Sequence, residues 1–390
     1  MAALNTVKRE ENGIISDVAL AQVRSAIRPL TRRSGFLPCA VLFFLAPLVG
    51  EVLAGSTPLD ILGSPASFLT LLLLEALLYG GGAVLIRDIA RRTGRGWPAI
   101  LGLGLAYGVL EEGLITQSFF NPDFLGLHLL GLGSLLGLGW VWITDLVPLH
   151  AVWSIGVPIA LAELLFRDRG TEAWLGRLGL TLASALFAVG VLGMWLATYA
   201  SERTFVAPWP KLLGALAVVV VITQLALRLT RRSAGAGSAA VARAPSAWLV
   251  GVSSFTAASL FMGVHQLYSA FPNLPGAVPV AVTVAVATAM IGLVLHWSRK
   301  HGWGPVHHLA LAAGALFTYA WTGFFTISLG DRLDLAGQVV ADGLAVALVV
   351  VLAVQMSRNR STAVSSPLKV LPDRQGTLYP PRIESLNCRL

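Results

Sequence analysis

Charged residues are scarce in this sequence, because only 12% of its 390 residues are aspartate, glutamate, lysine or arginine. Soluble globular domains carry about 25% charged residues, and 55% of this chain is hydrophobic. Apolar runs of about 18 residues or more recur between short polar segments, and such runs predict membrane-spanning helices. The strands of a transmembrane barrel would instead alternate apolar and polar residues. The sequence therefore predicts an all-α, polytopic helical membrane protein.

Cysteine is nearly absent, since the chain holds only Cys39 and Cys388. Two cysteines exclude a disulfide framework, and neither has the spacing of a metal-binding motif. The net charge is +8, but no basic patch with interleaved aromatic residues is present, so we expect no nucleic-acid partner. No cleavable signal peptide is expected, because about 35 mostly polar residues precede the first apolar run. The expected partner is the lipid bilayer.

Ten apolar segments are long enough to cross a hydrocarbon core of about 30 Å at about 1.5 Å per residue. Pro148 and Pro158 lie in the fourth segment, so we expect that span to be kinked, tilted or split. The predicted spans are 36–55, 66–86, 97–118, 136–166, 176–199, 210–230, 247–269, 275–297, 304–329 and 334–356.

Positive charges are distributed unevenly between the two sides of these spans. Of the 28 lysines and arginines, 25 fall on one side, and only Arg203, Lys211 and Arg332 fall on the other. Cytoplasmic loops carry the excess of basic residues in membrane proteins. We therefore predict a multi-pass protein of the cell membrane with both termini in the cytoplasm.

The chain divides into five predicted segments. A basic cytoplasmic arm covers 1–34, and a six-helix membrane region with the candidate site covers 35–230. A small, flexible cytoplasmic linker at 231–246 separates it from a four-helix membrane region at 247–356. The polar cytoplasmic tail at 357–390 is expected to be disordered.

Two adjacent glutamates, Glu111 and Glu112, interrupt the third predicted span. A carboxylate at membrane depth is costly and marks a functional site by default. The predicted topology places the pair in the outer half of the membrane, with His150 near mid-depth and His265 near the outer end of the seventh span. These four residues are the candidate catalytic residues. Other acidic residues predicted at middle or outer depth are Glu51, Glu75 and Asp145.

A tandem glutamate pair followed by histidines in later spans resembles the CPBP (CAAX protease and bacteriocin-processing) family of intramembrane endopeptidases. The first motif of that family is Glu-Glu, three residues, then Arg. Glu111 and Glu112 match the glutamates, and Thr116 stands at the position of the arginine. The second motif is Phe, three residues, then His. His150 matches the histidine, and Leu146 stands at the Phe position.

The third motif of the family places a histidine four residues before Asn or a similar polar residue, and His265 with Ser269 is a loose counterpart. The resemblance covers 97–166 and, more weakly, 247–269. It implies a glutamate that activates water for attack on the carbonyl of a membrane-embedded peptide substrate. It also implies histidines that hold the water or stabilise the oxyanion. Glutamate and histidine would suit zinc too, so the sequence leaves the use of a metal open.

Three functions are compatible with these residues. A CPBP-like intramembrane protease requires Glu111 or Glu112 to converge with His150 within about 4–8 Å, and His265 could join them. A proton- or cation-coupled membrane transporter would use the carboxylates to bind the coupling ion. In a non-catalytic assembly or sensor protein, the same polar groups would only lock helices together.

Three structural expectations accompany the candidate site. Gly108 and Gly113 flank the glutamate pair and should allow close approach of a neighbouring helix. The apolar, glycine-rich segment 119–140 could fold back from the outer face and cover the glutamates. On the cytoplasmic side, Arg87 and Asp88 are interpreted as ordinary interfacial charges beside a basic loop.

Overall fold

The computed structural model describes residues 35–57, 64–128, 130, 134–229, 242–271, 274–327 and 332–365, without the side chains of 229, 265–270 and 359–365. Regular structure in these ranges is helical, apart from one bridge between Arg243 and His301 and one short antiparallel hairpin. Its strands are β1 (Ser134–Leu135) and β2 (Leu138–Gly139). The all-α prediction is confirmed. The arm at 1–34 and most of the predicted linker and tail lie outside the described residues.

Each of the ten predicted spans corresponds to an apolar helix in the described ranges. Nine helices of the described part of the chain have the length and composition to cross a membrane, and Phe36–Val52 is apolar but shorter. The first four spans contain α2 (Phe36–Pro47), α3 (Pro65–Glu75) with α4 (Gly81–Arg92), α5 (Trp97–Leu110), and α6 (Trp140–Leu149) with α7 (Val157–Leu165). The later spans are α8 (Arg177–Ser201), α9 (Trp209–Leu229), α10 (Ala247–Ala270), α11 (Ala277–Ser298), α12 (Pro305–Thr326) and α13 (Arg332–Ser365).

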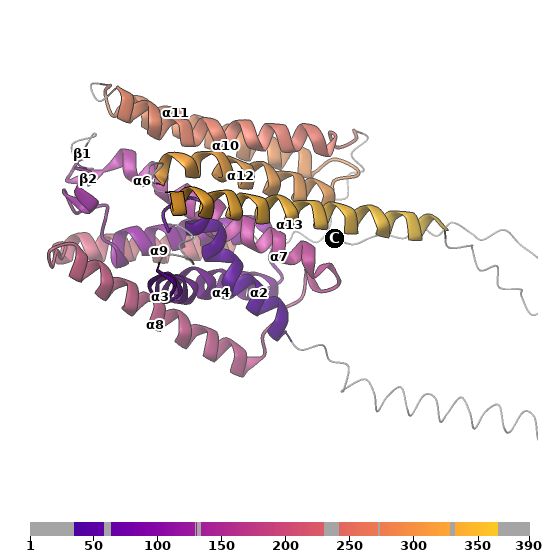
Figure 1. Ribbon diagram of the computed structural model, residues 1–390, viewed down its shortest axis with the longest axis horizontal. Helices are drawn as coiled ribbons and strands as arrows, with labels where there is room; N and C mark the ends of the chain where they lie inside the picture. The colour runs from indigo at the N-terminus through magenta and orange to yellow at the C-terminus, as the bar shows by residue number, and fades with distance from the viewer. Residues whose placement is uncertain are drawn as a thin grey trace, which may run out of the picture.

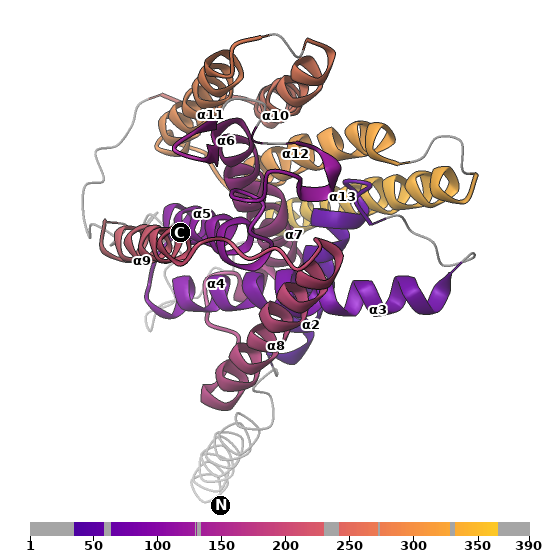
Figure 2. The same cartoon turned by 90° about the vertical axis from the view of Figure 1, so that its left-hand side faces the viewer.

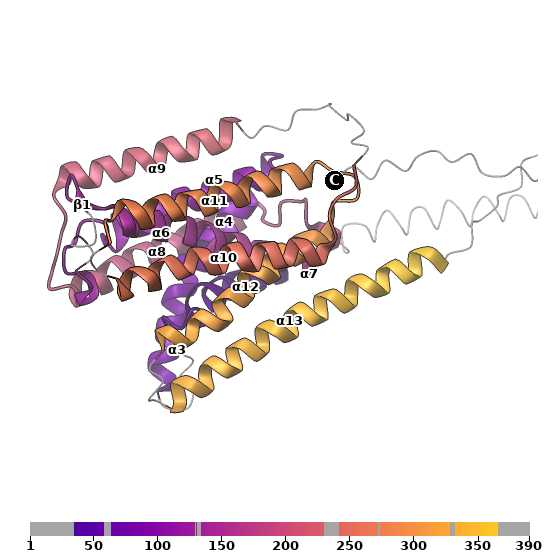
Figure 3. The same cartoon turned by 90° about the horizontal axis from the view of Figure 1, so that it is seen from above.

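Most of the helices run roughly along one direction, as expected for a membrane bundle (Figure 1, Figure 3). Figure 2 looks roughly along that direction, and there α4, α5 and α7 lie near the centre, with α8, α9, α11 and α13 around them. Burial follows this arrangement, since the third and fourth spans are the most buried and α8, α9 and α11 are largely exposed. The predicted site residues Glu111, Glu112 and His150 therefore belong to the two spans that are best shielded from lipid.

The first six spans and the last four pack against each other through an aromatic contact. The ring of Trp153 stacks on Tyr319 of α12, with ring centroids 5.0 Å apart and planes inclined by 12°. Trp153 also donates its indole N–H to the carbonyl of Ala315 at 2.8 Å. Both rings are buried within one apolar cluster. This contact holds α12 against the fourth span, which carries His150.

The basic loops of the described chain meet at one end of the bundle. Arg95 donates to the carbonyl of Leu227 at 2.6 Å, and the backbone of Ala244 donates to His301 at 2.8 Å. The opposite end holds a different set of loops, where Lys211 donates to the carbonyl of Gly137 at 2.9 Å. These loops therefore lie at opposite ends of the bundle, as the predicted order of spans requires.

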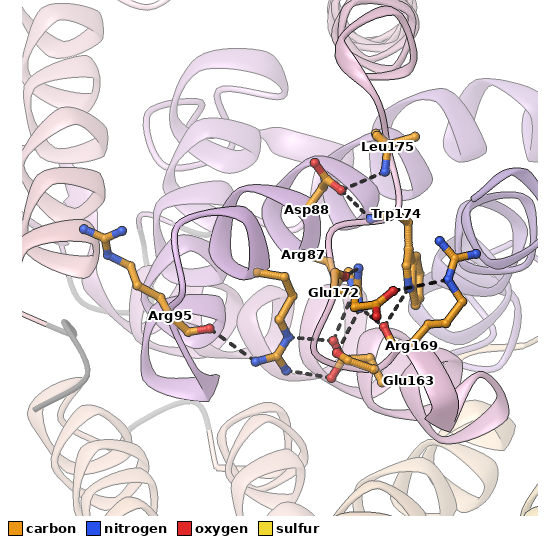
Figure 4. A network of polar contacts seen from close by, with 10 residues as sticks. Arg87, Asp88, Arg95, Glu163, Arg169, Glu172, Trp174 and Leu175 are labelled. Atoms are coloured by element: carbon orange, nitrogen blue, oxygen red, sulfur yellow. Dashed lines mark hydrogen bonds and ion pairs between the residues drawn. The ribbon is translucent and has the colours of Figure 1, made fainter. Parts of the chain in front are cut away.

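Arg87, at the basic end, is fully buried, so its interpretation as an interfacial charge is wrong. Its guanidinium donates to Glu163 at 3.0 Å and lies 3.5 Å from the centroid of the Trp174 ring (Figure 4). Further donors bind the carbonyls of Arg169, Gly170 and Glu172. The loop after α7 therefore folds over the end of α4 and removes Arg87 from solvent.

Asp88 is buried beside Arg87, and the interfacial interpretation is wrong for it too. One carboxylate oxygen accepts the backbone N–H groups of Trp174 and Leu175 at 2.8 Å and 3.0 Å (Figure 4). The other oxygen pairs with Arg92 at 2.7 Å. Because the guanidinium of Arg87 and the carboxylate of Asp88 are fully hydrogen-bonded, the free-energy cost of burying these two charges is reduced. The same hydrogen bonds fix the loop 166–176 in place.

Candidate functional site

All four π-helical segments in the described part of the chain carry residues of one polar cluster. The segments are Leu48–Val52, Ala76–Gly80, Glu111–Ile115 and His150–Gly156. Single π-helical turns inside α-helices are rare and occur frequently at functional sites, because they re-aim side chains and disturb the backbone ladder. Pro47 and Pro148 lie just before two of these segments, where each removes a backbone donor. Four spans thus deviate from regular helix at the same place.

Two glycines of α5 bring the third and fourth spans into close contact. A Cβ on Gly104 would lie 2.9 Å from Cα of Ala151, and one on Gly108 would lie 3.0 Å from the carbonyl oxygen of Val147. Neither position has room for a side chain without movement of backbone. The expectation for Gly108 is confirmed. Gly113 is close to a different helix, since its Cβ would lie 3.1 Å from Ala215 of α9.

Glu112 and His150 face each other across these two spans. Oε1 of Glu112 lies 2.9 Å from Nε2 of His150, and both side chains are buried. The second oxygen of Glu112 accepts the hydroxyls of Ser118 and Thr116, the latter at 3.1 Å. On the far side of the ring, Nδ1 of His150 lies 3.0 Å from the hydroxyl oxygen of Ser154. Both partners of the contact are therefore held by hydroxyl groups.

Glu111 approaches the same imidazole from another direction. Its Oε1 accepts the hydroxyl of Tyr79, and its Oε2 lies 3.4 Å from Nδ1 of His150. Oε2 is buried and has no hydrogen-bond partner among the described residues. One ligand atom from each of Glu111, Glu112 and His150 can be chosen so that all three lie within 4.8 Å of one another. The structure brings these three predicted residues together, and their catalytic role stays a prediction.

Two further glutamates extend the cluster. Glu75 is buried, accepts the hydroxyl of Thr57 at 2.5 Å, and leaves Oε2 without a partner. Glu75 lies close enough to Glu51 and Glu111 for their charges to interact. Glu51, in turn, contacts Tyr79 and lies within electrostatic range of Glu112. The sequence places Glu51 and Glu75 at a compatible depth, and the structure adds them to the site.

Two tyrosines of the site are missed by sequence reasoning. Tyr79 donates to Glu111, and its ring lies roughly parallel to that of His150 with centroids 6.1 Å apart. Tyr107 contacts His150 edge-on at the same centroid distance, and its buried hydroxyl interacts with the carboxylate of Glu111. Their position in apolar runs could have indicated both residues, because a buried tyrosine hydroxyl normally needs a polar partner.

The start of the segment 119–140 lies beside the end of the third span, and its predicted role as a cover over the glutamates stays a prediction. The backbone N–H of Phe119 donates to the carbonyl of Glu112 at 3.4 Å, and Trp142 donates to the hydroxyl of Ser118 at 3.0 Å. Phe119 and Phe120 are buried. Gln117 has φ of 58°, which is rare for a residue with a side chain. The chain thus turns sharply after the third span; residues 129 and 131–133 lie outside the described part.

Two other residues at predicted outer depth have a different outcome. His265 lies on α10, but its side chain is outside the described residues, so its predicted role stays a prediction. Asp145 lies half-buried on α6.

The fold and the cluster define a polytopic helical membrane protein with a buried glutamate–histidine site. The model of an uncharacterized membrane protein family matches residues 40–356, and the chain belongs to that family. No curated protein and no solved structure matches this chain. The match begins within α2 and ends within α13, and it includes the whole described cluster. Because the family is uncharacterized, arguments about chemistry depend on the site itself.

Proposed function

We propose that this chain is an intramembrane hydrolase of CPBP-like type that cleaves a peptide bond with water activated by Glu112 and His150. The observation that supports it most is the 2.9 Å contact between Glu112 Oε1 and His150 Nε2. A carboxylate and an imidazole at this distance can accept and return a proton during hydrolysis. Burial of both groups strengthens their electrostatic effect on a reacting carbonyl.

The reaction needs one water molecule and one proton acceptor. The water oxygen bonds to the peptide carbonyl carbon, and its proton passes to the Glu112–His150 pair. The pair then returns that proton to the peptide nitrogen as the C–N bond breaks. The ring of Tyr107 contacts His150, and its buried hydroxyl beside Glu111 is a candidate donor to the oxyanion.

Thr116 has a role in this proposal that fits its departure from the CPBP pattern. Where that pattern has an arginine, the Thr116 hydroxyl donates to Oε2 of Glu112 at 3.1 Å. Ser118 donates to the same oxygen. Two neutral hydroxyls thus orient the carboxylate without pairing its charge, which leaves Glu112 free to act as a base toward His150 or water.

The proposal also includes a location and a substrate class. We infer that the chain lies in the cell membrane and that the end of the bundle with Arg87, Arg95 and Arg243 faces the cytoplasm, because cytoplasmic loops are enriched in basic residues. The site then lies toward the opposite face, among spans shielded from lipid. A peptide segment embedded in the membrane is the substrate class that such a position favours.

A cleavage assay tests the proposed function. Full-length protein in proteoliposomes is incubated with a panel of single-span membrane peptides, and products are identified by mass spectrometry. General acid–base catalysis contributes about 10²–10⁴-fold to rate, so Glu112→Gln and His150→Ala should lose cleavage by that factor. Glu172→Gln changes an exposed carboxylate and is the matched control. Equal rates in all variants contradict the proposal.

One observation favours a cation-coupled carrier as the second candidate. Glu51, Glu75, Glu111 and Glu112 interact within one cluster, and among the described residues His150 is the only ion-pair partner of Glu111 and Glu112. An excess of buried carboxylates is typical of proton and cation sites in transporters. Ion-driven uptake into proteoliposomes that disappears in Glu111→Gln, without peptide cleavage by the wild type, would favour this candidate.

A further inference from the structure

The proposed reaction uses Glu112 and His150 and leaves two nearby glutamates without a role. Glu51 belongs to the first span and Glu75 to the second. The chain between these spans links them, because the backbone N–H of Thr57 donates to the carbonyl of Glu51 at 3.2 Å and its hydroxyl donates to the carboxyl group of Glu75 at 2.5 Å. The two carboxyl groups lie within electrostatic range of each other, so the charge of one depends on the charge of the other.

The carboxyl groups of the cluster outnumber its ion-pair partners. Four glutamates interact within it, and in the described part of the chain their only ion pairs are those of Glu111 and Glu112 with His150. Buried carboxylates that lie close together do not all ionise, because each negative charge raises the free energy of the next. At least one carboxyl group of the cluster is therefore protonated.

The hydroxyl of Tyr79 narrows the choice to two groups. It forms hydrogen bonds both with Glu51 and with Oε1 of Glu111. A tyrosine hydroxyl has one hydrogen to donate, and its oxygen can also accept a hydrogen bond. Two carboxylates would compete for that single hydrogen. Both contacts of Tyr79 are satisfied when one partner is a carboxylate and the other is a carboxylic acid that donates to the tyrosine oxygen.

The other contacts of these two groups favour Glu111 as the carboxylate. The hydroxyl of Tyr107 interacts with Glu111, and Oε2 of Glu111 lies 3.4 Å from Nδ1 of His150. Hydrogen-bond donors and nearby positive charge stabilise the ionised form of a carboxyl group. Glu51 has no such ring of donors, since Ser56 is its other side-chain hydrogen-bond partner. The proton between the two groups therefore belongs on Glu51.

We propose that Glu51 is a carboxylic acid that donates to Tyr79, and that these two residues form an exchangeable proton-binding site. Tyr79 in turn donates to Oε1 of Glu111, whose Oε2 faces His150. A carboxylic acid that stays neutral supplies a hydrogen-bond donor without adding negative charge to the site. Glu51 and Tyr79 are thus positioning residues: they hold Glu111 toward Nδ1 of His150 and touch no reacting atom.

Burial distinguishes Glu51 from the other glutamates of the cluster. Glu51 is only partly buried, whereas Glu75, Glu111 and Glu112 are buried. It lies on the π-helical segment Leu48–Val52, which ends the first helix of the bundle. The carboxyl group that carries the proton is therefore also the one with exposed surface, and its proton can exchange without any opening of the rest of the cluster.

The effect of this site on cleavage rests on the proposed function, but the presence of the proton does not. When Glu51 ionises at alkaline pH, Tyr79 loses its donor and the cluster gains a negative charge, so Glu111 is no longer held toward His150. Cleavage should therefore fall as Glu51 loses its proton. The titratable groups that face Glu51 and share this equilibrium are Glu75, Glu111, Glu112, His150, Tyr79, Tyr107 and Tyr319.

Infrared spectroscopy of the purified full-length protein tests the proton site without any substrate. The protein is measured at neutral pH in a detergent that has no carbonyl groups, in H₂O and in D₂O. A protonated carboxyl group gives a carbonyl band that is separate from the carboxylate bands and shifts in D₂O. We expect this band in the wild type, a loss of the band in Glu51→Gln, and a shift of the band in Tyr79→Phe, which removes the acceptor. Glu172→Gln replaces an exposed glutamate and should retain the band.

The cleavage assay tests what the proton does. Glu51→Leu has no donor for Tyr79 and should reduce cleavage by up to about 10²-fold, as misplacement of catalytic groups does. Glu51→Gln should restore much of that loss, because its amide N–H can replace the carboxylic acid as donor. Glutamine cannot ionise, so the alkaline loss of cleavage in Glu51→Gln should begin at a higher pH than in the wild type.

Either of two infrared results overturns the proton site. One is a wild-type protein without an exchangeable acid band, a readout that does not depend on the folding of any variant. The other is a band that persists in Glu51→Gln and disappears in Glu111→Gln, which would place the proton on Glu111. Equal cleavage by Glu51→Gln and Glu51→Leu, with the wild-type band present, would contradict the positioning role. An acid band assigned to Glu51 without cleavage by the wild type would keep the proton site and contradict the hydrolase.

Discussion

Nε2 of His150 lies 2.9 Å from Oε1 of Glu112, on a neighbouring span. The contact exists because Gly104 and Gly108 let α5 approach the fourth span and because both spans adopt π-helical turns at this point. Hydroxyl groups then fix both partners. Backbone packing, helix irregularity and side-chain hydrogen bonds therefore all position this pair, and substitutions can separate their contributions.

Glu112→Gln should separate activity from stability. Glutamine keeps the shape of the side chain, and its carbonyl oxygen can still accept the Ser118 hydroxyl while its amide faces His150. We expect the thermal midpoint of the detergent-solubilised protein to stay close to that of the wild type, while peptide cleavage falls about 10²–10⁴-fold. Thermal unfolding and cleavage are measured on the same preparation. A collapse of stability with no separate effect on catalysis would assign Glu112 to helix packing.

The two hydroxyl donors to Glu112 should be coupled. Ser118→Ala or Thr116→Ala leaves one donor in place, whereas the double variant leaves Oε2 of Glu112 buried and unbonded. An unsatisfied buried acceptor costs about 1–3 kcal/mol. The free energy of unfolding of the double variant should therefore fall by more than the sum of the single effects. Additive losses in the double-mutant cycle would indicate that the hydroxyls do not share the carboxylate.

Gly104→Ala should push the third and fourth spans apart. The added Cβ would lie 2.9 Å from Cα of Ala151, and backbone cannot move away cheaply. Overpacking of this kind costs about 1–3 kcal/mol, and the displacement should also reduce cleavage because Glu112 and His150 separate. Gly292→Ala on α11 is the control, since nothing lies within 4 Å of its Cβ. Equal melting temperatures for both variants would refute the close approach.

Arg87→Lys should destabilise the basic end of the bundle. Lysine offers three donors from one point and cannot reach Glu163 and the carbonyls of Arg169, Gly170 and Glu172 together. Breaking a buried charge network costs about 3–5 kcal/mol. Arg299→Lys, at an exposed position, should change stability little. Thermal unfolding and limited proteolysis of the loop 166–176 provide the readouts, and an unchanged loop would contradict the role assigned to Arg87.

The membrane fold could be predicted from sequence because its physical cause is local. Runs of apolar residues and the scarcity of charge leave few alternatives, and each predicted span has an apolar helix. Tandem carboxylates in the third span also stand out, since their cost at membrane depth requires a reason. The depth in the membrane that was predicted for each residue then indicated that Glu111, Glu112 and His150 could lie in one site.

The rest of the site depends on packing that no local pattern reveals. π-helical turns have no sequence signature, so the aim of Tyr79 and Ser154 could not be foreseen. Ser118 reaches Glu112 only because the chain turns at Gln117 with φ of 58°. The interpretation of Arg87 was wrong for a related reason: the loop that buries it follows α7, far along the chain.

The most direct test of the central claim compares peptide cleavage by wild-type and Glu112→Gln protein in the same proteoliposomes. The account predicts cleavage by the wild type and a loss of about 10²–10⁴-fold in the variant, at similar thermal stability. Cleavage at the same rate by both proteins, or by neither, would contradict it.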